Sequence, residues 1–133
     1  TAWVSASAIE GIRSIEITLS KDRPVQEAVY TVRLYFAELE NKNPGDRIFD
    51  IFIQDQQVTR NFDIVGEAGK PDREVIKTYR GIKAGETLNV GLTPSRGKPL
   101  ISGIEIFRED DSANIREFSP MKNNLKLKVY IKP

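Results

Sequence analysis

Residues Val29–Gln54 read VYTVRLYFAELENKNPGDRIFDIFIQ, which is two runs of alternating apolar and polar residues around a polar link. Successive side chains of a strand point to opposite faces, so each run predicts a strand with one buried face. The link contains Asn43-Pro44-Gly45-Asp46, where proline fixes φ and glycine permits positive φ. The stretch therefore predicts two adjacent strands of a half-buried sheet, joined by a turn.

The same alternation recurs along the chain, and turn residues separate the segments about every 8–12 positions. No segment of about ten or more residues has the 3.6-residue period of an amphipathic helix. We expect strands at 12–19, 29–38, 47–58, 74–82, 87–93, 100–107 and 125–131. A short strand or bend is expected at 61–65, and a loop at 66–73. This pattern predicts an all-β fold, an antiparallel jelly-roll-like β-sandwich.

The 133 residues are expected to form a single domain. Its predicted parts are a core over 12–107, a polar connector over 108–124 and a C-terminal edge strand over 125–131. Lysines alternate in that last strand, and edge lysines discourage unwanted strand pairing. Because the chain opens at Thr1 without Met, we expect a processed product or a piece of a larger protein.

The composition excludes several classes of chemistry. The chain has no cysteine and no histidine, so disulfides, thiolate nucleophiles, Cys/His zinc sites and Ser-His-Asp triads are ruled out. A net charge of +1 argues against a nucleic-acid partner, and no apolar run approaches the roughly 20 residues of a membrane span. We expect no cofactor, although Glu109-Asp110-Asp111 leaves a structural calcium ion open as a weaker alternative.

Four acidic residues could be interpreted as a pair of catalytic carboxylates: Glu38, Glu40, Asp46 and Asp50. Glycoside hydrolysis needs two carboxyl groups held about 5–9.5 Å apart in a cleft. Scattered acids in a chain with 29% charged residues are usually solvated side chains. We therefore predict that the domain is not an enzyme.

Four ordered blocks resemble the malectin and malectin-like family of carbohydrate-binding domains. They are YTVRLYFAE at 30–38, RIFDIFIQDQQV at 47–58, NFDIVGEAG at 61–69 and PLISGIEI at 99–106. The resemblance implies a non-catalytic, lectin-like accessory domain of a larger secreted, periplasmic or cell-surface protein. Similar domains are appended to bacterial polysaccharide-degrading proteins and occur in plant receptor ectodomains. The implied partners are an oligo- or polysaccharide and neighbouring domains of the same chain.

The candidate sugar site centres on Tyr35. A two-residue period sends Tyr35 to the face away from the core, beside Arg33, where the predicted strand ends. The resemblance places the aromatic pair of the family's sugar site at Tyr35 and Phe36. Sugars stack their CH faces on aromatic rings and bind planar polar side chains through their hydroxyls. Arg33, Glu38 and Asp50 are the candidate hydroxyl partners, on or near the same nominal face.

Three of the candidate site residues also have purely structural explanations. Phe36 shares its parity with Val32 and Leu34, which favours the core, and Tyr35 could simply cover a sheet edge. Trp3 is either a second stacking platform or a plug at the end of the sandwich.

Parts of the family's sugar site are missing from this chain. The family carries further aromatic residues ahead of the first block, where this chain has only Trp3, and a loop carboxylate where this chain has Gly97. The competing hypothesis is therefore a structural, interdomain or protein–protein interaction sandwich that has lost sugar binding. A third, minor hypothesis is a protein–protein recognition domain that uses the outward residues Ile48 and Phe52. The alternative for these two residues is that another segment or a neighbouring domain packs over them.

Overall fold

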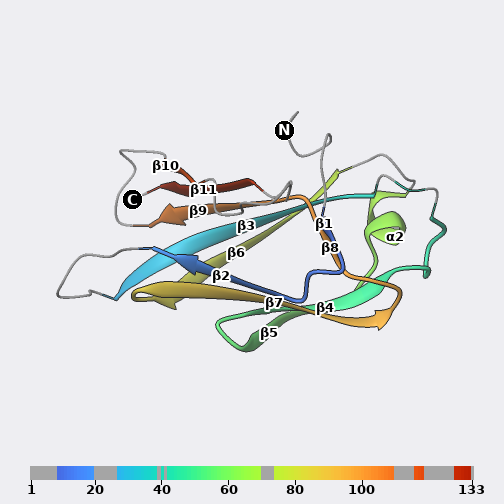
Figure 1. Ribbon diagram of the computed structural model, residues 1–133, viewed down its shortest axis with the longest axis horizontal. Coiled ribbons are helices and arrows are strands. Elements are labelled where there is room, and N and C mark those ends of the chain that lie inside the picture. The colour runs from blue at the N-terminus through green and yellow to red at the C-terminus, as the bar shows by residue number, and fades with distance from the viewer. Residues whose placement is uncertain are drawn as a thin grey trace.

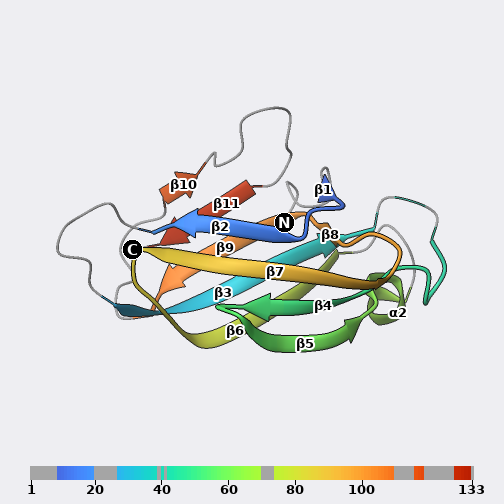
Figure 2. The same cartoon turned by 60° about the horizontal axis from the view of Figure 1, so that its bottom comes forward.

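The computed structural model describes residues 9–19, 27–38, 40, 42–69, 74–109, 116–118 and 128–132. Two twisted sheets lie face to face and enclose the core (Figures 1 and 2). The five-stranded sheet has the order β10-β11-β9-β3-β6, and the four-stranded sheet has the order β2-β7-β4-β5. A short pair, β1-β8, forms a third sheet. The predicted all-β, antiparallel sandwich is confirmed.

The bounds of the elements follow from the hydrogen-bonding pattern. The five-stranded sheet contains β10 (Arg116–Phe118), β11 (Lys128–Lys132), β9 (Gly103–Arg108), β3 (Ala28–Ala37) and β6 (Glu74–Ala84). The four-stranded sheet contains β2 (Ser14–Thr18), β7 (Thr87–Arg96), β4 (Ile48–Ile53) and β5 (Gln56–Phe62). The short pair is β1 (Ile9–Glu10) and β8 (Leu100–Ile101), and the described residues include one helix, α2 (Ile64–Ala68).

The strands on either side of the Asn43–Asp46 link are not neighbours. β3 pairs with β6 and β9, whereas β4 pairs with β5 and β7. The prediction of an adjacent strand pair is therefore wrong, and the link crosses from one sheet to the other. Alternation shows that a strand has one buried face, but it does not say which strand lies beside it. Here both strands bury that face against the same core from opposite sides.

The predicted strand over 47–58 is divided into β4 and β5 by a tight turn. Gln54 and Asp55 both have positive φ, at 52° and 63°, which is the backbone of a two-residue hairpin turn. The side chain of Gln54 holds this turn, since its amide donates to the carbonyl of Lys83 and its oxygen accepts from the backbone N–H of Asn89. Glycine or asparagine usually marks such turns, and this one has neither.

Three phenylalanine rings form the centre of the core. Phe36 of β3 contacts Phe62 of β5 edge to face with ring centroids 4.7 Å apart, and Phe49 of β4 lies 5.8 Å from Phe36 and 5.5 Å from Phe62. All three are at most 1% exposed. They join the two sheets, and the expectation from parity that Phe36 is a core residue is confirmed.

The C-terminal part of the sandwich differs from the prediction in two ways. β10 lies within the predicted connector over 108–124, so that stretch is not a connector throughout. β11 lies between β10 and β9 and runs parallel to β9, so it is not an edge strand. Alternating lysines identify a strand but not its place in the sheet. Residues 125–127 of the predicted strand lie outside the described part of the chain.

At one end of the sandwich, the residue that caps α2 also binds the Asn43–Asp46 link. Asp63 caps α2, accepting from the backbone N–H of Gly66, and Gly69 ends the helix with φ of 85°. The same Asp63 carboxylate accepts from the backbone N–H of Gly45 at 2.7 Å. The Asn43–Asp46 link is thereby tied to α2 at the right-hand end of Figure 1.

Replacing the central ring should destabilise the fold strongly. We expect Phe36→Ala to lower the free energy of unfolding by about 3–5 kcal/mol, because it leaves a cavity between the two sheets. Urea denaturation measures this change. Ile76→Ala is the control, because Ile76 is 46% exposed and its replacement should change stability by less than about 0.5 kcal/mol. Equal losses for the two variants would contradict the assignment of Phe36 to the core.

Candidate functional site

A buried ion pair lies where the chain crosses between the sheets. Glu38 directly follows β3 and Arg47 directly precedes β4, so the crossing brings the two side chains together. Their side chains are only 1% and 3% exposed. Arg47 Nε donates to Glu38 Oε1 at 2.6 Å and Nη2 donates to Glu38 Oε2 at 3.2 Å. This two-point contact is the strong, geometrically specific form of an arginine–carboxylate bond.

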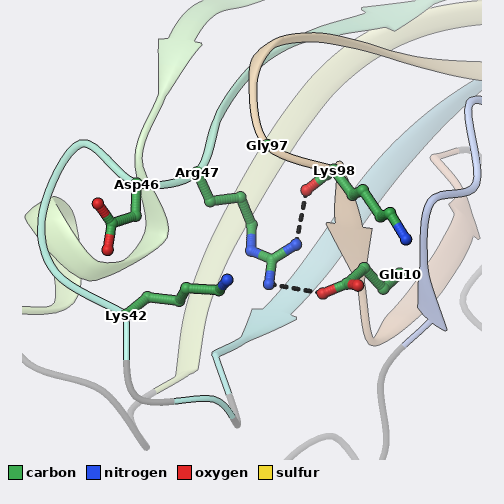
Figure 3. Close-up of a pocket in the computed structure, with 6 residues that line it drawn as sticks. All are labelled: Glu10, Lys42, Asp46, Arg47, Gly97 and Lys98. Carbon is green, nitrogen blue, oxygen red and sulfur yellow. Dashed lines mark hydrogen bonds and ion pairs between the residues drawn. The ribbon is translucent and has the colours of Figure 1, made fainter.

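Arg47 also binds two other segments at this end of the sandwich. Its Nη2 donates to Glu10 Oε2 at 2.8 Å, and its Nη1 donates to the backbone carbonyl of Lys98 at 2.6 Å (Figure 3). One guanidinium therefore holds β1, the end of β3 and the β7–β8 loop together. Removing it would release three segments at once.

The protonation of this cluster is set by the same contacts. Burial alone would lower the pKa of Arg47, but its hydrogen bonds to Glu38 and Glu10 and their negative charges together outweigh that effect and raise the pKa above its ordinary value. The hydrogen bond from Arg47 lowers the pKa of Glu10, against a smaller opposing effect of burial. Both groups are therefore charged at neutral pH, and the bonds are charge-assisted.

A hollow of about 250 Å³, lined mainly by charged residues, opens beside this guanidinium (Figure 3). Its lining comes from β1, the Asn43–Asp46 link and the β7–β8 loop: Glu10, Lys42, Asp46, Arg47, Gly97 and Lys98. Gly97 has φ of +65°, and a Cβ atom there would lie 2.8 Å from the Asp46 carbonyl oxygen. The β7–β8 loop therefore packs directly on the link. The residues that line the hollow carry both ammonium and carboxylate groups.

Tyr35 is not an exposed platform. It points away from the main core, as its parity predicts, but it is only 4% exposed. Its hydroxyl donates to Glu105 Oε1 at 3.0 Å, and Arg33 Nη1 donates to the same oxygen at 3.2 Å. The Arg33 guanidinium lies 4.8 Å from the centroid of the Phe107 ring. The prediction of an exposed ring is wrong, since parity gives the face of a strand and not what covers it.

The other predicted site residues are separated by the fold. Phe36 is in the core with 0% exposure, and Glu38 is the buried partner of Arg47. Asp50 is on the outer face of the four-stranded sheet, opposite the sheet that carries Tyr35. The prediction that Glu38 and Asp50 share a face with Tyr35 is therefore wrong, and only Arg33 lies near it, through Glu105. Trp3 lies outside the described residues.

The sequence prediction missed Arg47 and Lys98, which shape the hollow. One signal for Arg47 is present, because an acid ends one strand and an arginine begins the next on either side of the 39–46 link. Lys98 contributes its backbone carbonyl to Arg47, and no side-chain pattern predicts such a contact.

Two further observations concern ions and membranes. Within the described residues, no group of three or more His, Cys, Asp or Glu side chains could hold a metal ion. Asp110 and Asp111 of the predicted calcium alternative are outside those residues, and Glu109 accepts from Thr31 Oγ1 and the Gly81 N–H. Across the same part of the chain, no helix has the length and apolar character needed to span a bilayer.

Known proteins resemble this chain in sequence and in fold. A family model described as the malectin domain matches residues 13–104. A probable receptor-like protein kinase of Arabidopsis thaliana is 33% identical over 96 residues, which are 65% of this chain and 11% of that protein. A probable LRR receptor-like serine/threonine-protein kinase of the same plant is 36% identical over 94 residues, covering 58% of this chain and 9% of that protein. The chain thus spans about a tenth of the length of these curated relatives.

Solved structures share the fold at low sequence identity. The β-glucuronidase of Bacteroides uniformis matches with a TM-score of 0.60 at 19% identity, over 74% of this chain and 11% of that chain. The ANX1 ectodomain from Arabidopsis thaliana matches with a TM-score of 0.59 at 20% identity, over 77% of this chain and 28% of that chain. The two sequence relatives described above are plant proteins, so they give no support to a bacterial source for this chain.

Breaking the buried ion pair should cost much more than breaking an exposed one. We expect Arg47→Met to lower the free energy of unfolding by about 3–5 kcal/mol, because Glu38 stays buried without its partner. Arg33→Met is the matched control, since the Arg33 side chain is 41% exposed and its ion pair should contribute about 1 kcal/mol or less. Urea denaturation compares the two. A loss for Arg47→Met no larger than that of the control would contradict the buried Glu38–Arg47 ion pair.

The Glu10 contact should appear as an acid dependence of stability. The pKa of Glu10 is lowered in the folded chain, so the unfolded chain takes up this proton first as the pH falls. The Arg47–Glu10 contact contributes fully to folding stability above the ordinary glutamate pKa of 4.5, and this contribution disappears as the pH falls through the pKa of Glu10 in the folded chain. Below pH 4.5 we expect Glu10→Gln to lose stability less steeply than the wild type. Parallel denaturant titrations at several pH values measure this slope, and identical slopes would argue against the Arg47–Glu10 bond in solution.

Proposed function

Because the chain belongs to the malectin domain family, we propose that it is a non-catalytic carbohydrate-binding module in the extracellular part of a larger protein. The hollow beside Arg47, with its charged lining residues, carries this proposal. Relatives described as probable receptor-like kinases, and a fold shared with a β-glucuronidase and a receptor ectodomain, support an accessory role within a longer chain. The proposed ligand is a glycan bound at the hollow.

The chemistry of the hollow suits sugar hydroxyls, which both donate and accept hydrogen bonds. Lys42 and Lys98 supply ammonium donors, and Asp46 and Glu10 supply carboxylate acceptors. Arg47 fixes the Glu10 carboxylate and the loop that carries Lys98, so part of the site is ordered before a ligand arrives. Ordering before binding lowers the entropic cost of association.

The size of the hollow favours a terminal sugar residue over a long chain. Pockets for drug-sized ligands have volumes of about 300–1,000 Å³, and this one has about 250 Å³. A single sugar residue held by surface hydrogen bonds binds weakly. Attachment to a larger protein with further binding sites would raise the overall affinity without new contacts.

A second candidate function is a protein–protein or interdomain interaction module. The observation that favours it is the absence of a stacking ring, since none of the described residues that line the hollow is aromatic. Tyr35 and Phe36, which the family resemblance assigned to sugar stacking, are both buried here. A hollow with charged side chains and no ring would then take the polar side chains of a protein partner.

A glycan array followed by titration separates the two candidates. We expect the 133-residue chain to bind at least one glycan, and Lys98→Ala or Lys42→Ala to weaken that binding about tenfold, the effect of losing about 1.4 kcal/mol of hydrogen bonding. Arg47 is left unchanged because it supports the fold.

Lys83→Ala is the control for these lysine variants. Lys83 pairs in register with Val29, at the end of β3 opposite Glu38, and should leave the affinity unchanged. Binding to no glycan on the array would overturn the carbohydrate proposal in favour of the interaction module. Glycan binding that is unaffected by both hollow variants would overturn the hollow as the site.

A further inference from the structure

The outer face of the four-stranded sheet carries a half-buried aromatic residue next to a glycine. Phe52 alternates with the core residues Ile51 and Ile53 of β4, so its side chain is on the solvent side of the sheet. Its partner across β7 is Gly91, and its partner across β5 is Gln57. Gly91 in turn pairs with Ser14 of β2. One row across all four strands therefore contains a ring beside a position with no side chain.

A fixed carboxylate–amide pair lies next to this ring. Asp50, two residues before Phe52, accepts from Gln57 Nε2 at 3.0 Å and from the backbone N–H of Asn61 at 2.8 Å. The Gln57 amide is thereby oriented. Its oxygen and its second N–H take part in no hydrogen bond with another described residue. An acceptor and a donor are thus held at one place on the face.

Packing explains only part of this arrangement. A ring opposite a glycine can shield the glycine backbone, and a Cβ atom on Gly91 would lie 3.4 Å from Phe52 Cβ. That role requires neither the Asp50–Gln57 bond nor the amide groups that the bond leaves open beside the ring. A sugar residue uses both features, because its CH face stacks on a ring while its hydroxyls pair with a carboxylate or an amide.

We propose that this sheet face is a second glycan-binding surface, on which Phe52 stacks against one residue of a neutral, unbranched oligosaccharide while Asp50 and Gln57 bind its hydroxyls. The site goes beyond the proposed function, because it is on a different part of the molecule from the hollow and uses different residues. Ser14, Gly91 and Gln57 in the Phe52 row carry no charge, so a neutral chain fits them.

The chemistry of the face favours a glycan over a protein. A stable protein interface buries about 800 Å² per partner and has an apolar centre. Apart from Phe52 and Ile48, the outward side chains of this sheet are mainly polar: Ser14, Glu16, Asn89, Thr93 and Gln57. A single ring within a polar surface matches the alternating CH and hydroxyl groups of a sugar chain.

The test is a titration of the isotope-labelled 133-residue chain with cellohexaose, xylohexaose and mannohexaose, followed by NMR. We expect at least one of these neutral hexaoses to shift the backbone amides of Phe52 and Gly91 and the side-chain amide of Gln57. Raising the salt from about 0.05 to 0.5 M should leave this affinity unchanged, because a neutral ligand gains nothing from screened charges.

Variants identify the stacking residue. Phe52→Ala should weaken binding at least tenfold, Gln57→Ala should weaken it about threefold or more, and Phe52→Tyr should stay within threefold of the wild type. Ile76→Ala, which removes an exposed apolar residue from the other sheet, is the control and should bind like the wild type. Thermal unfolding of each variant verifies the fold. If Phe52→Ala does not fold, Gln57→Ala and Phe52→Tyr carry the test.

The outcomes separate this inference from the proposed function. Shifts confined to Gly97 and Lys98, with affinity unaffected by Phe52→Ala, would overturn the sheet-face site and leave the hollow intact. Loss of the Gly91 and Gln57 shifts in Phe52→Ala, with Lys98→Ala binding like the wild type, would support the sheet face as a separate site. Shifts with none of the three hexaoses would overturn the sheet-face proposal, while the glycan array decides the hollow independently.

Discussion

The buried bond between Glu38 and Arg47 is the contact on which one whole end of the domain depends. Taking two charges out of water costs several kcal/mol for each, and the attraction between them offsets this only when the geometry is good. Here Arg47 makes four hydrogen bonds, two of them to Glu38, so its buried charge is well satisfied. The main effect of such a pair is to fix geometry. It holds the chain at the point where it leaves one sheet and enters the other.

That crossing also determines which surfaces the domain presents. Because β3 and β4 belong to different sheets, their outward residues point in opposite directions, and Tyr35 and Asp50 cannot form one site. The crossing link and the β7–β8 loop instead meet at Arg47, where their polar side chains border the hollow. The second open surface, around Phe52, is on the far side of the four-stranded sheet. A ligand at the hollow and a ligand at the sheet face would therefore not compete.

The sequence predicts burial well here and pairing poorly. Phe49, Ile51 and Ile53 share one face of β4 by a two-residue period, and all three are in the core, because that period is a local property of the strand. The partner of a strand is a non-local property, which is why the adjacent pairing of β3 and β4 was predicted wrongly. Arg47 was missed because charged residues are seldom buried, and the Glu38 that compensates it is brought close only by the crossing.

The block YTVRLYFAE illustrates how far a family resemblance reaches. Phe36 joins the two sheets through Phe62, Glu38 anchors Arg47, and the Tyr35 hydroxyl binds Glu105. Each of these roles serves the scaffold of this chain and involves no ligand. Similarity in this block is therefore evidence for the sandwich and for the end of it that the Glu38–Arg47 pair holds together. Evidence about the ligand has to come from residues that the scaffold does not require, such as Lys98 at the hollow and Gln57 beside Phe52.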